Sequence, residues 1–600
     1  MATVLLDFFE PFFNLSWLTG PIFDKELRVS SRRRKNYVLR FAYLVFLTTF
    51  LALVWIQAMG YTGSSLYRMS RMAEAGKGIV ACVVWFQFCV TQVVAAIMLS
   101  TAISDEIYHG TLGLLMTTTI SSFQIVMGKL LSRLLQLTLL LAISLPLLAI
   151  VRVFGGVPWS YVISSLCITL ATIIFVGSLS LFFSIFTRKA YVVIILTCLT
   201  IAAIFALLPF MALMFWHTFE LRSVISEKTL FEIILLPNPY CIMFFNTMTM
   251  MTPRATAGIP SFTWPLHCGM ILTASAVLLS VCVVRVRKVG LRQATGQSGS
   301  SSRKRRSRKS PSQALADEHD LAVEPRRIVG PPVLWREWKS TLLGRRRFIT
   351  VVTTVSICLI LLLITYLLCG IEGVLDEKEI QEAYAVVLLG LGLLSTMVLA
   401  STCITSEKEA RSWPLLLTTT LDDRDILLGK FVGAVRRCSP AWLLLLGHTL
   451  FFALVGILHP AAIFQAGILV TWVVVFLVGS GLYFSSCYKR TTTAVMMNFA
   501  LVVVIWGIFP FVMAMTALIN HDTHPLIETC MDMHPIVHAI VIFETAVKND
   551  GGYGWFSFGS IDRIGGVRST VWMLTCMAGH VSLGLLFAWR AKCRFRRNIF

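Results

Sequence analysis

Twelve runs of about twenty mostly apolar residues restrict the fold of this chain more than any other feature. About 20 residues of apolar helix cross the hydrocarbon core of a bilayer. We therefore predict an all-α integral membrane protein of twelve transmembrane helices, six in each half of the chain. The predicted spans are Val38 to Ala58, Ile79 to Ile103, Leu130 to Val151, Tyr161 to Ile185, Ala190 to Phe215, Trp264 to Val284, Phe348 to Cys369, Ala383 to Ile404, Ala441 to Leu458, Ala461 to Ser486, Thr493 to Leu518 and Ser569 to Trp589.

Composition and charge agree with a membrane location. Hydrophobic residues make up 56% of the chain and charged residues 14%, which is too little polar surface for a soluble globule of this size. If the N-terminus is cytoplasmic, most of the 52 Lys and Arg residues fall on the cytoplasmic side, as the positive-inside rule requires. We therefore predict a plasma (inner) membrane protein with both termini in the cytoplasm. Its basic runs are expected to contact membrane lipids and not nucleic acid.

A cytoplasmic segment occurs twice, each time between two predicted spans. Segment one is Ser104 to Leu135, and segment two is Thr405 to Arg436. A single offset of 301 residues aligns Glu106 with Glu407, as well as the leucine pair, the threonine triplet and the Gly-Lys pair of each copy. A repeat of this length indicates two structural units that complete one assembly together. We therefore predict a pseudo-dimer made of two tandem six-helix repeats.

Each segment is predicted to contain a helix, a break and the start of the next span. In segment one, acids stand at the beginning and Lys129 near the end, the arrangement that a helix dipole favours. The Thr/Ser run between them supplies hydroxyl caps for a second helix that begins near Phe123. A short amphipathic helix at the membrane face has a shape that docks into a groove on a partner.

A polar linker divides the two halves. Residues 290–329 are rich in Ser, Arg, Lys and Gln and have no apolar periodicity, so we predict a disordered basic cytosolic tether. The predicted domains are 1–289 and 330–600, each a six-span unit. In the second unit Pro331 to Lys339 matches Phe23 to Arg28 of the first, and both mixtures of apolar and basic residues suit a helix in the inner interface that leads into a span.

These segments resemble those of the type 2 ABC exporter permeases. The family pattern is an acid, then Gly-Thr-Leu, Leu-Leu and Thr-Thr-Pro, then a hydrophobic residue and Gly-Lys, and the resemblance covers both halves apart from the linker. It implies that each segment is a coupling helix that contacts a separate ATPase subunit. The residues matched to this coupling role are Glu106, Gly110, Thr111, Leu114, Leu115, Thr117, Thr118, Gly128 and Lys129 in segment one, and Glu407, Leu415, Leu416, Thr418, Thr419, Gly429 and Lys430 in segment two. Neither copy has the proline after the threonines, and segment two has Arg411-Ser412-Trp413 in place of Gly-Thr-Leu.

The chain carries no recognisable energy source or catalytic constellation. A phosphate-binding P-loop needs G-x-x-x-x-G-K-[ST], and neither Gly128-Lys129 nor Gly429-Lys430 has the upstream glycine or the hydroxyl. There is also no GxSxG elbow and no HExxH helix. We therefore expect no enzyme and no cofactor, and we expect ATP hydrolysis in partner subunits, two per chain.

Two other readings stay open at this point. An ion-coupled secondary transporter usually places acids within its spans, whereas the twelve predicted spans contain neither Asp nor Glu. His448 in the ninth predicted span is a candidate for such a role, and a packed structural histidine is the ordinary explanation. An ABC-coupled envelope scaffold without transport would keep the same fold. The exported substrate is not identified by the sequence.

An outer loop before the last predicted span concentrates possible metal ligands, from His521 to His538. Histidine, cysteine and carboxylate side chains at this density can bind zinc or copper. No ligand spacing is diagnostic, however, and we assign no metal site. Two apolar stretches, Leu230 to Met250 and Pro535 to Val547, are predicted to be partial spans that dip into the outer leaflet.

Overall fold

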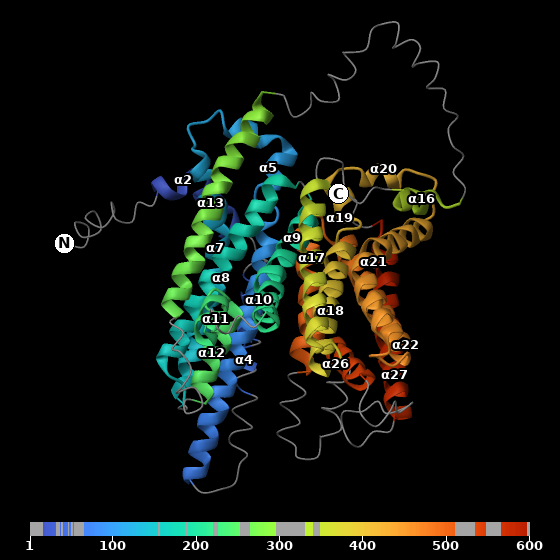
Figure 1. Ribbon diagram of the computed structural model, residues 1–600. Helices are drawn as coiled ribbons and strands as arrows, with labels where there is room; N and C mark the ends of the chain where they lie inside the picture. The colour runs from blue at the N-terminus through green and yellow to red at the C-terminus, as the bar shows by residue number, and fades with distance from the viewer. Residues whose placement is uncertain are drawn as a thin grey trace, which may run out of the picture. The chain divides into compact units, whose positions relative to one another are not determined.

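The structure is a computed structural model, and every regular element in its described part is helical (Figure 1). The described residues are 16–31, a few positions between 37 and 52, 65–153, 156–187, 189–219, 226–252, 264–295, 330–339, 348–510, 534–547 and 566–596. One isolated β-bridge, between Leu458 and Val547, is the exception to the helical backbone in these ranges. The prediction of an all-helical chain is therefore confirmed for the part that the structure describes.

The chain forms two compact units. Unit 1 comprises Met1–Thr48, Gly76–Thr197 and Leu236–Gly330, and unit 2 comprises Thr49–Ala75, Cys198–Leu235 and Pro331–Phe600. Unit 2 thus takes in two stretches from the first half of the sequence, Thr49–Ala75 and Cys198–Leu235, in addition to everything that follows Gly330.

The helices of unit 1 begin with a short amphiphilic helix and continue with long apolar ones. They are α2 (Ser16–Ser31), α4 (Ser65–Leu99), α5 (Ser104–His109), α6 (Thr111–Leu115), α7 (Ser122–Val153), α8 (Trp159–Phe186), α9 (Ala190–Ala202), α12 (Pro239–Met251) and α13 (Trp264–Ala294). Most of α4 and of α9 belongs to unit 1, and the remainder of each belongs to unit 2. The last helix, α13, continues to Ala294, beyond the predicted start of the linker at residue 290.

Among the residues that the structure describes, unit 2 opens with three short helices from the first half of the chain and then repeats the order of unit 1, a short amphiphilic helix followed by long apolar ones. Its helices are η1 (Ala203–Leu207), α10 (Leu208–Thr218), α11 (Glu227–Leu235), α16 (Pro332–Lys339), α17 (Phe348–Glu372), α18 (Lys378–Ser401), α19 (Thr405–Glu409), α20 (Trp413–Leu417), α21 (Asp423–Val455), α22 (Ala461–Cys487), α23 (Thr491–Val502), η3 (Val503–Ile508), α26 (Pro535–Ala546) and α27 (Gly566–Arg594). The π-helical turns η1 and η3 fall in the predicted fifth and eleventh spans, which are equivalent spans of the two predicted repeats.

Ten helices in the described part are long and apolar enough to cross a membrane, which identifies a multi-pass membrane protein. They are Gly76–His109, Ser122–Arg152, Trp159–Phe186, Ala190–Thr218, Trp264–Gln293, Val352–Glu372, Lys378–Ser401, Asp423–Val455, Ala461–Cys487 and Thr491–Ile508. The first of the twelve predicted spans lies largely outside the described residues. The last corresponds to α27, which is less apolar on average than the ten and contains the basic residues Arg590 and Lys592.

Close helix packing within each unit depends on small residues. In unit 2, α22 packs extensively on α27, and a Cβ atom added at Gly479 would lie 2.1 Å from the carbonyl oxygen of Gly584. In unit 1 the atoms nearest to a Cβ atom added at Gly177 of α8 belong to leucine side chains, those of Leu99 on α4, at 3.3 Å, and Leu130 on α7. Small residues allow helix backbones to approach one another where no hydrophobic effect draws them together.

The two stretches predicted to be partial spans contain short apolar helices: Leu230 to Met250 covers the end of α11 and most of α12, and Pro535 to Val547 covers α26. α26 has 12 residues, too few to cross a bilayer, and α12 has 13. Each begins at a buried proline, and the preceding side chain caps the helix: Asn238 accepts hydrogen bonds from the Tyr240 and Cys241 amides, and His534 accepts one from the Ile536 amide. These caps satisfy backbone donors that the first turn of a helix leaves open.

Candidate functional site

Segment one folds as two very short helices, a turn and the start of a long helix. Helices α5 and α6 are separated by Gly110, whose φ of 75° is a left-handed conformation that glycine adopts without a side-chain clash. After the threonine triplet, Ser121 and Gln124 cap the start of α7 reciprocally, because each side chain hydrogen-bonds the backbone amide of the other. The predicted Thr/Ser break with a hydroxyl cap is confirmed, whereas the single predicted helix is divided at Gly110.

Segment two repeats this course. Helices α19 and α20 precede the turn at the second threonine triplet, and α21 follows from Asp423. The left-handed residue between α19 and α20 is Arg411, with φ 56°, which is the one non-glycine residue with positive φ among the described residues. Arg411 is the residue that the repeat aligns with Gly110. The same backbone turn is therefore made by glycine in one segment and by a strained arginine in the other.

Burial also corresponds at aligned positions of the two segments. Leu114 and Leu415 are 70% and 71% exposed, although both are large apolar side chains. The threonine triplets 117–119 and 418–420 are exposed as well, whereas Ile125 and Ile426 are buried. Each segment thus presents one protruding leucine, followed by hydroxyl side chains, on a short helix whose opposite side is packed.

In unit 1 the packed side of segment one is held by an ion-pair cluster. The Lys129 ammonium, near the start of α7, lies 3.1 Å from Glu26 Oε1 of α2 and 2.9 Å from Glu106 Oε1 of α5. Arg133, one turn further along α7, is 3.6 Å from the other Glu26 oxygen. The Thr111 hydroxyl donates to the Glu106 carboxylate. One lysine therefore links three elements: α2, which we call the entry helix of unit 1 as α16 is that of unit 2, the short helix α5 and the long apolar helix α7.

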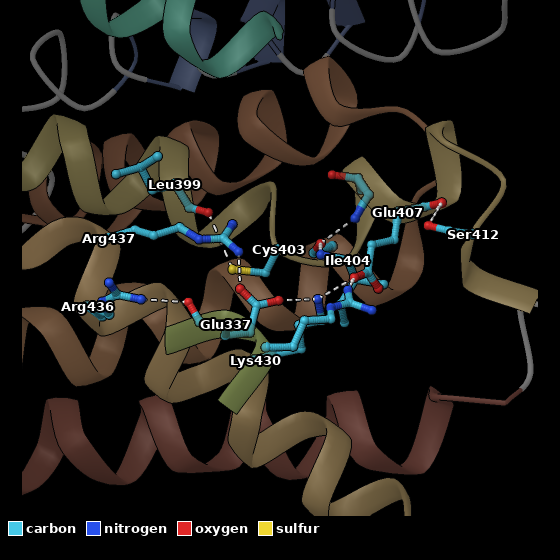
Figure 2. Close-up of polar contacts among 12 residues, drawn as sticks. Glu337, Leu399, Cys403, Ile404, Glu407, Ser412, Lys430, Arg436 and Arg437 are labelled. Atoms are coloured by element: carbon cyan, nitrogen blue, oxygen red, sulfur yellow. Dashed lines mark hydrogen bonds and ion pairs between the residues drawn. The ribbon is translucent and has the colours of Figure 1, made fainter. Parts of the chain in front are cut away.

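Unit 2 contains the corresponding cluster in a more buried form (Figure 2). The Lys430 ammonium is 2.6 Å from Glu337 Oε1 of α16 and 2.6 Å from Glu407 Oε1 of α19. Arg437 binds the second Glu337 oxygen, and Arg336 binds Glu407. Burial alone would raise the pKa of the Glu337 carboxyl, but the charges and hydrogen bonds of Lys430 and Arg437 outweigh it and hold this pKa below its ordinary value.

Glycines let α16 lie close enough to α21 to form this cluster. A Cβ atom at Gly429 would stand 2.8 Å from Val333 Cγ1, and one at Gly433 would stand 3.0 Å from Glu337 Cβ. Gly429 therefore serves the approach of two helices next to Lys430. It is buried, as is Gly128 of segment one.

Segment two has further anchors on the C-terminal end of α22. The Lys408 ammonium donates to the carbonyl oxygens of Ser485, Ser486 and Tyr488, and burial lowers the pKa of this lysine to about 8. The Ser485 hydroxyl accepts hydrogen bonds from the amides of Ile404 and Thr405. The residue of segment one at the Lys408 position is Ile107, which has no charge to contribute.

Aromatic packing adds to the attachment of segment two. Trp413 is almost fully buried, and its ring packs edge to face on Phe595, just beyond α27, with the centroids 5.0 Å apart. Segment one has Leu112 at this position, and its contacts to the end of α13 include a 3.1 Å hydrogen bond from Gln293 Nε2 to the Ile107 carbonyl oxygen.

The sixteen predicted coupling residues differ in how deeply they are buried. The exposed ones are Gly110, Leu114, Thr117, Thr118, Leu415, Thr418 and Thr419. The half-buried ones are Glu106, Thr111 and Leu115. The buried ones are Gly128, Lys129, Glu407, Leu416, Gly429 and Lys430. The acid and the lysine that both segments share therefore face one another inside each unit.

Sequence reasoning missed Glu26 and Glu337, the acids that complete the two clusters. A signal was available, because each lies among apolar and basic residues in a stretch expected to form the interfacial helix. An acid in such a stretch is a candidate partner for a nearby buried lysine.

Polar side chains within the spans form interhelical hydrogen bonds. Gln87 accepts from the Ser144 hydroxyl at 3.0 Å, and Gln92 accepts from the Tyr240 hydroxyl at 2.6 Å. His448 Nδ1 lies 2.7 Å from the Tyr366 hydroxyl, within an aromatic cluster. Such bonds join helices where water is absent.

Metal binding gains no support from the described residues, among which no group of three His, Cys, Asp or Glu side chains is placed to hold an ion. Most of the ligand-rich loop, 521–533, lies outside them. His534 is the cap of α26, and His538 is buried beside Trp472 with the ring centroids 5.9 Å apart.

No protein-family model matches the chain, and no curated protein matches it significantly.

Proposed function

We propose that this chain is the membrane-spanning permease of an ATP-driven exporter of the ABC type, with twelve spans in two six-helix repeats. In this proposal the termini and both segments lie in the cytoplasm, and each segment is a coupling helix that receives force from a separate ATPase subunit. ATP-driven closure of the two subunits would move the segments and rock the two repeats, which opens a path outward.

One observation carries the proposal: two large apolar side chains, Leu114 and Leu415, protrude at equivalent positions of the two segments. Exposed leucines are ordinary on a membrane-facing helix, but these two lie on helices of five residues next to exposed threonines. A protruding apolar side chain with a polar surround fits a pocket on a protein partner.

The ion-pair clusters support a transmitting role for the segments. Lys129 and Lys430 each connect a segment to an entry helix and to a long apolar helix of the same unit. A load applied at the protruding leucine would therefore reach two other helices through short ionic contacts. A free loop between two spans has no need of such bracing.

Affinity purification of the tagged full-length chain from its native cells tests the proposal. We expect a P-loop ATPase, recognised by its GxxxxGK[ST] peptide, to co-purify and to hydrolyse ATP. The double variant Leu114→Glu, Leu415→Glu should lose the ATPase, because the carboxylates cannot enter an apolar pocket. Leu114→Met, Leu415→Met is the matched control and should retain it.

Thermal melting of the purified chain shows whether either variant has lost its fold. Undiminished ATPase co-purification with the double glutamate variant, or the absence of any P-loop ATPase from the wild-type preparation, would contradict the proposal.

A further inference from the structure

The turns that follow the two protruding leucines differ in charge although their backbones correspond. Asp422, Asp423, Arg424 and Asp425 open α21, and the aligned residues of segment one are Ser121, Ser122, Phe123 and Gln124. Asp422, Arg424 and Asp425 are exposed. Asp423 pairs with Arg596 at 3.0 Å, so this acid is engaged within unit 2.

A second charge difference lies on the other side of the leucine. Arg411 is exposed in segment two, and its counterpart is Gly110. The strained backbone of Arg411 keeps a cationic side chain where glycine would be the easier residue. At these aligned positions the chain around Leu415 therefore carries ionised side chains of both signs, whereas the chain around Leu114 carries glycine, hydroxyl, amide and aromatic groups; the exposed acid of segment one, Asp105, lies further from Leu114 in the sequence.

Each segment also has its own degree of attachment. Lys408 and the Trp413 ring fix segment two to the ends of α22 and α27, and segment one has Ile107 and Leu112 at these positions. A firmly held surface keeps its exposed charges in fixed positions, which increases the selectivity of charged contacts.

Building on the proposed function, we propose that the two segments dock on two different ATPase chains, and that the groove receiving Leu415 carries a rim of charges complementary to Arg411, Asp422, Arg424 and Asp425. The groove receiving Leu114 is uncharged at its rim. If the two ATPase grooves were identical and uncharged at the rim, the charged residues of segment two would have no partners. If both grooves carried a charged rim, the uncharged turn of segment one would face ions that it cannot pair. Charge complementarity at the rim of an interface mainly selects partners and sets the salt dependence of binding.

The experiment uses the purified complex of the full-length chain with its ATPases, immobilised through the chain and washed at rising NaCl concentration. Mass spectrometry should find two different P-loop ATPase sequences. About 0.5 M NaCl should release one of them at least tenfold more than the other, because salt screens exposed charges and leaves apolar contacts intact.

Matched variants assign each ATPase to a segment. Asp422→Lys, Asp425→Lys should lower the recovery of the salt-sensitive ATPase by about tenfold and leave the other unchanged. The equivalent change in segment one, Ser121→Lys, Gln124→Lys, should spare the salt-sensitive ATPase. Leu114→Glu and Leu415→Glu alone should each remove a different chain.

A single ATPase sequence present in two copies, with equal salt release and equal response to both pairs of lysine variants, would overturn this inference and leave the proposed function standing. A preparation without any P-loop ATPase would overturn both.

Discussion

The two ion-pair clusters are built on one plan and differ in their exposure to water. The Lys129 side chain is 10% exposed, and its partners Glu26 and Glu106 are 23% and 24% exposed. The Lys430 side chain is 2% exposed, and Glu337 is 3% exposed. In unit 2 two arginines also join the cluster, and glycines bring α16 onto α21.

The repeated segment is therefore held differently in the two units. In unit 2 it has a strained residue, Arg411, and a nearly fully buried ion-pair cluster, whereas in unit 1 the turn is made by glycine and the cluster is partly exposed. Unit 2 attaches its segment through Lys430, Lys408 and Trp413, while the attachments of segment one include Lys129, Arg133 and the hydrogen bond from Gln293. Buried charges must be paired, because an ion without a partner is costly in a medium of low polarity. The comparison therefore predicts unequal consequences for the same substitution in the two units.

Removal of the central lysine should give the largest contrast. Lys430→Met removes the cation that Glu337 and Glu407 share and leaves each of these two neighbouring carboxylates with a single arginine partner, so we expect a loss of about 3 kcal/mol in the free energy of unfolding of unit 2. Lys129→Met should cost about 1 kcal/mol, because water reaches both of its carboxylates. Thermal melting of the full chain in detergent measures both losses.

A charge-balanced variant provides the control for this pair. Lys430→Met combined with Glu407→Gln keeps the net charge of the cluster and the buried Glu337–Arg437 pair, and it should recover much of the stability. Equal losses for the two single lysine variants would show that the exposure of the clusters does not control their energetics.

Substitution of the aligned glycines Gly479 and Gly177 should give the second-largest difference in stability between the units. Gly479→Ala places a Cβ atom against a backbone carbonyl, which cannot move aside as a side chain does, so we expect a loss of about 2–3 kcal/mol. Gly177→Ala meets only flexible leucine side chains and should cost under about 1 kcal/mol. If the two variants lower the melting temperature equally, alanine is tolerated equally at both positions and the close approach of α22 and α27 is not required.

The left-handed residues should respond in opposite directions. Arg411→Gly relieves a strained backbone and should stabilise the chain by about 1 kcal/mol, whereas Gly110→Ala introduces the same strain and should destabilise it by a similar amount. Arg411→Ala, which removes the side chain but keeps the strain, is the control. A stabilisation by Arg411→Ala equal to that by Arg411→Gly would attribute the effect to charge and not to the backbone.

Acid should weaken unit 2 through Glu337, with the smallest effect of the four. Because the pKa of this carboxyl is lower in the folded chain than its ordinary value, its contribution to stability is complete above that ordinary value and is lost as the pH falls through the folded pKa. The melting temperature should therefore decline below about pH 4. The Glu337→Gln variant should have a lower melting temperature at neutral pH, and its melting temperature should fall less steeply with acid. If the melting temperature falls as steeply as in the wild type, Glu337 is not the source of the decline.

Much of this architecture could be predicted from the sequence because the signals are local. A run of apolar residues commits a segment to a helix by composition alone, and ten predicted spans are present in the described part. The turn at the first threonine triplet could also be predicted, since Ser121 caps α7 through residues three positions away. The short apolar helices α12 and α26, which precede α13 and α27, could also be predicted from local composition.

Other features depended on contacts between residues far apart in the chain. Glu26 and Lys129 are separated by 103 positions, and Glu337 and Lys430 by 93. The local sequence marks each glutamate as a candidate partner for a lysine, but it does not say which lysine, because the two residues of each pair are far apart in the chain. The glutamates at 106 and 407 were expected to act at the surface, but their environment is set by α2 and α16, which lie elsewhere in the sequence.

The sequence by itself determined the helices, their apolar length and the correspondence between the two segments, because each of these is written in neighbouring residues or in direct identity. Only the tertiary structure decided which side chains of those segments face inward and which protrude. That choice depends on what packs behind them: an entry helix that supplies an acid, glycines that admit it, and helix ends that hold one segment more firmly than the other.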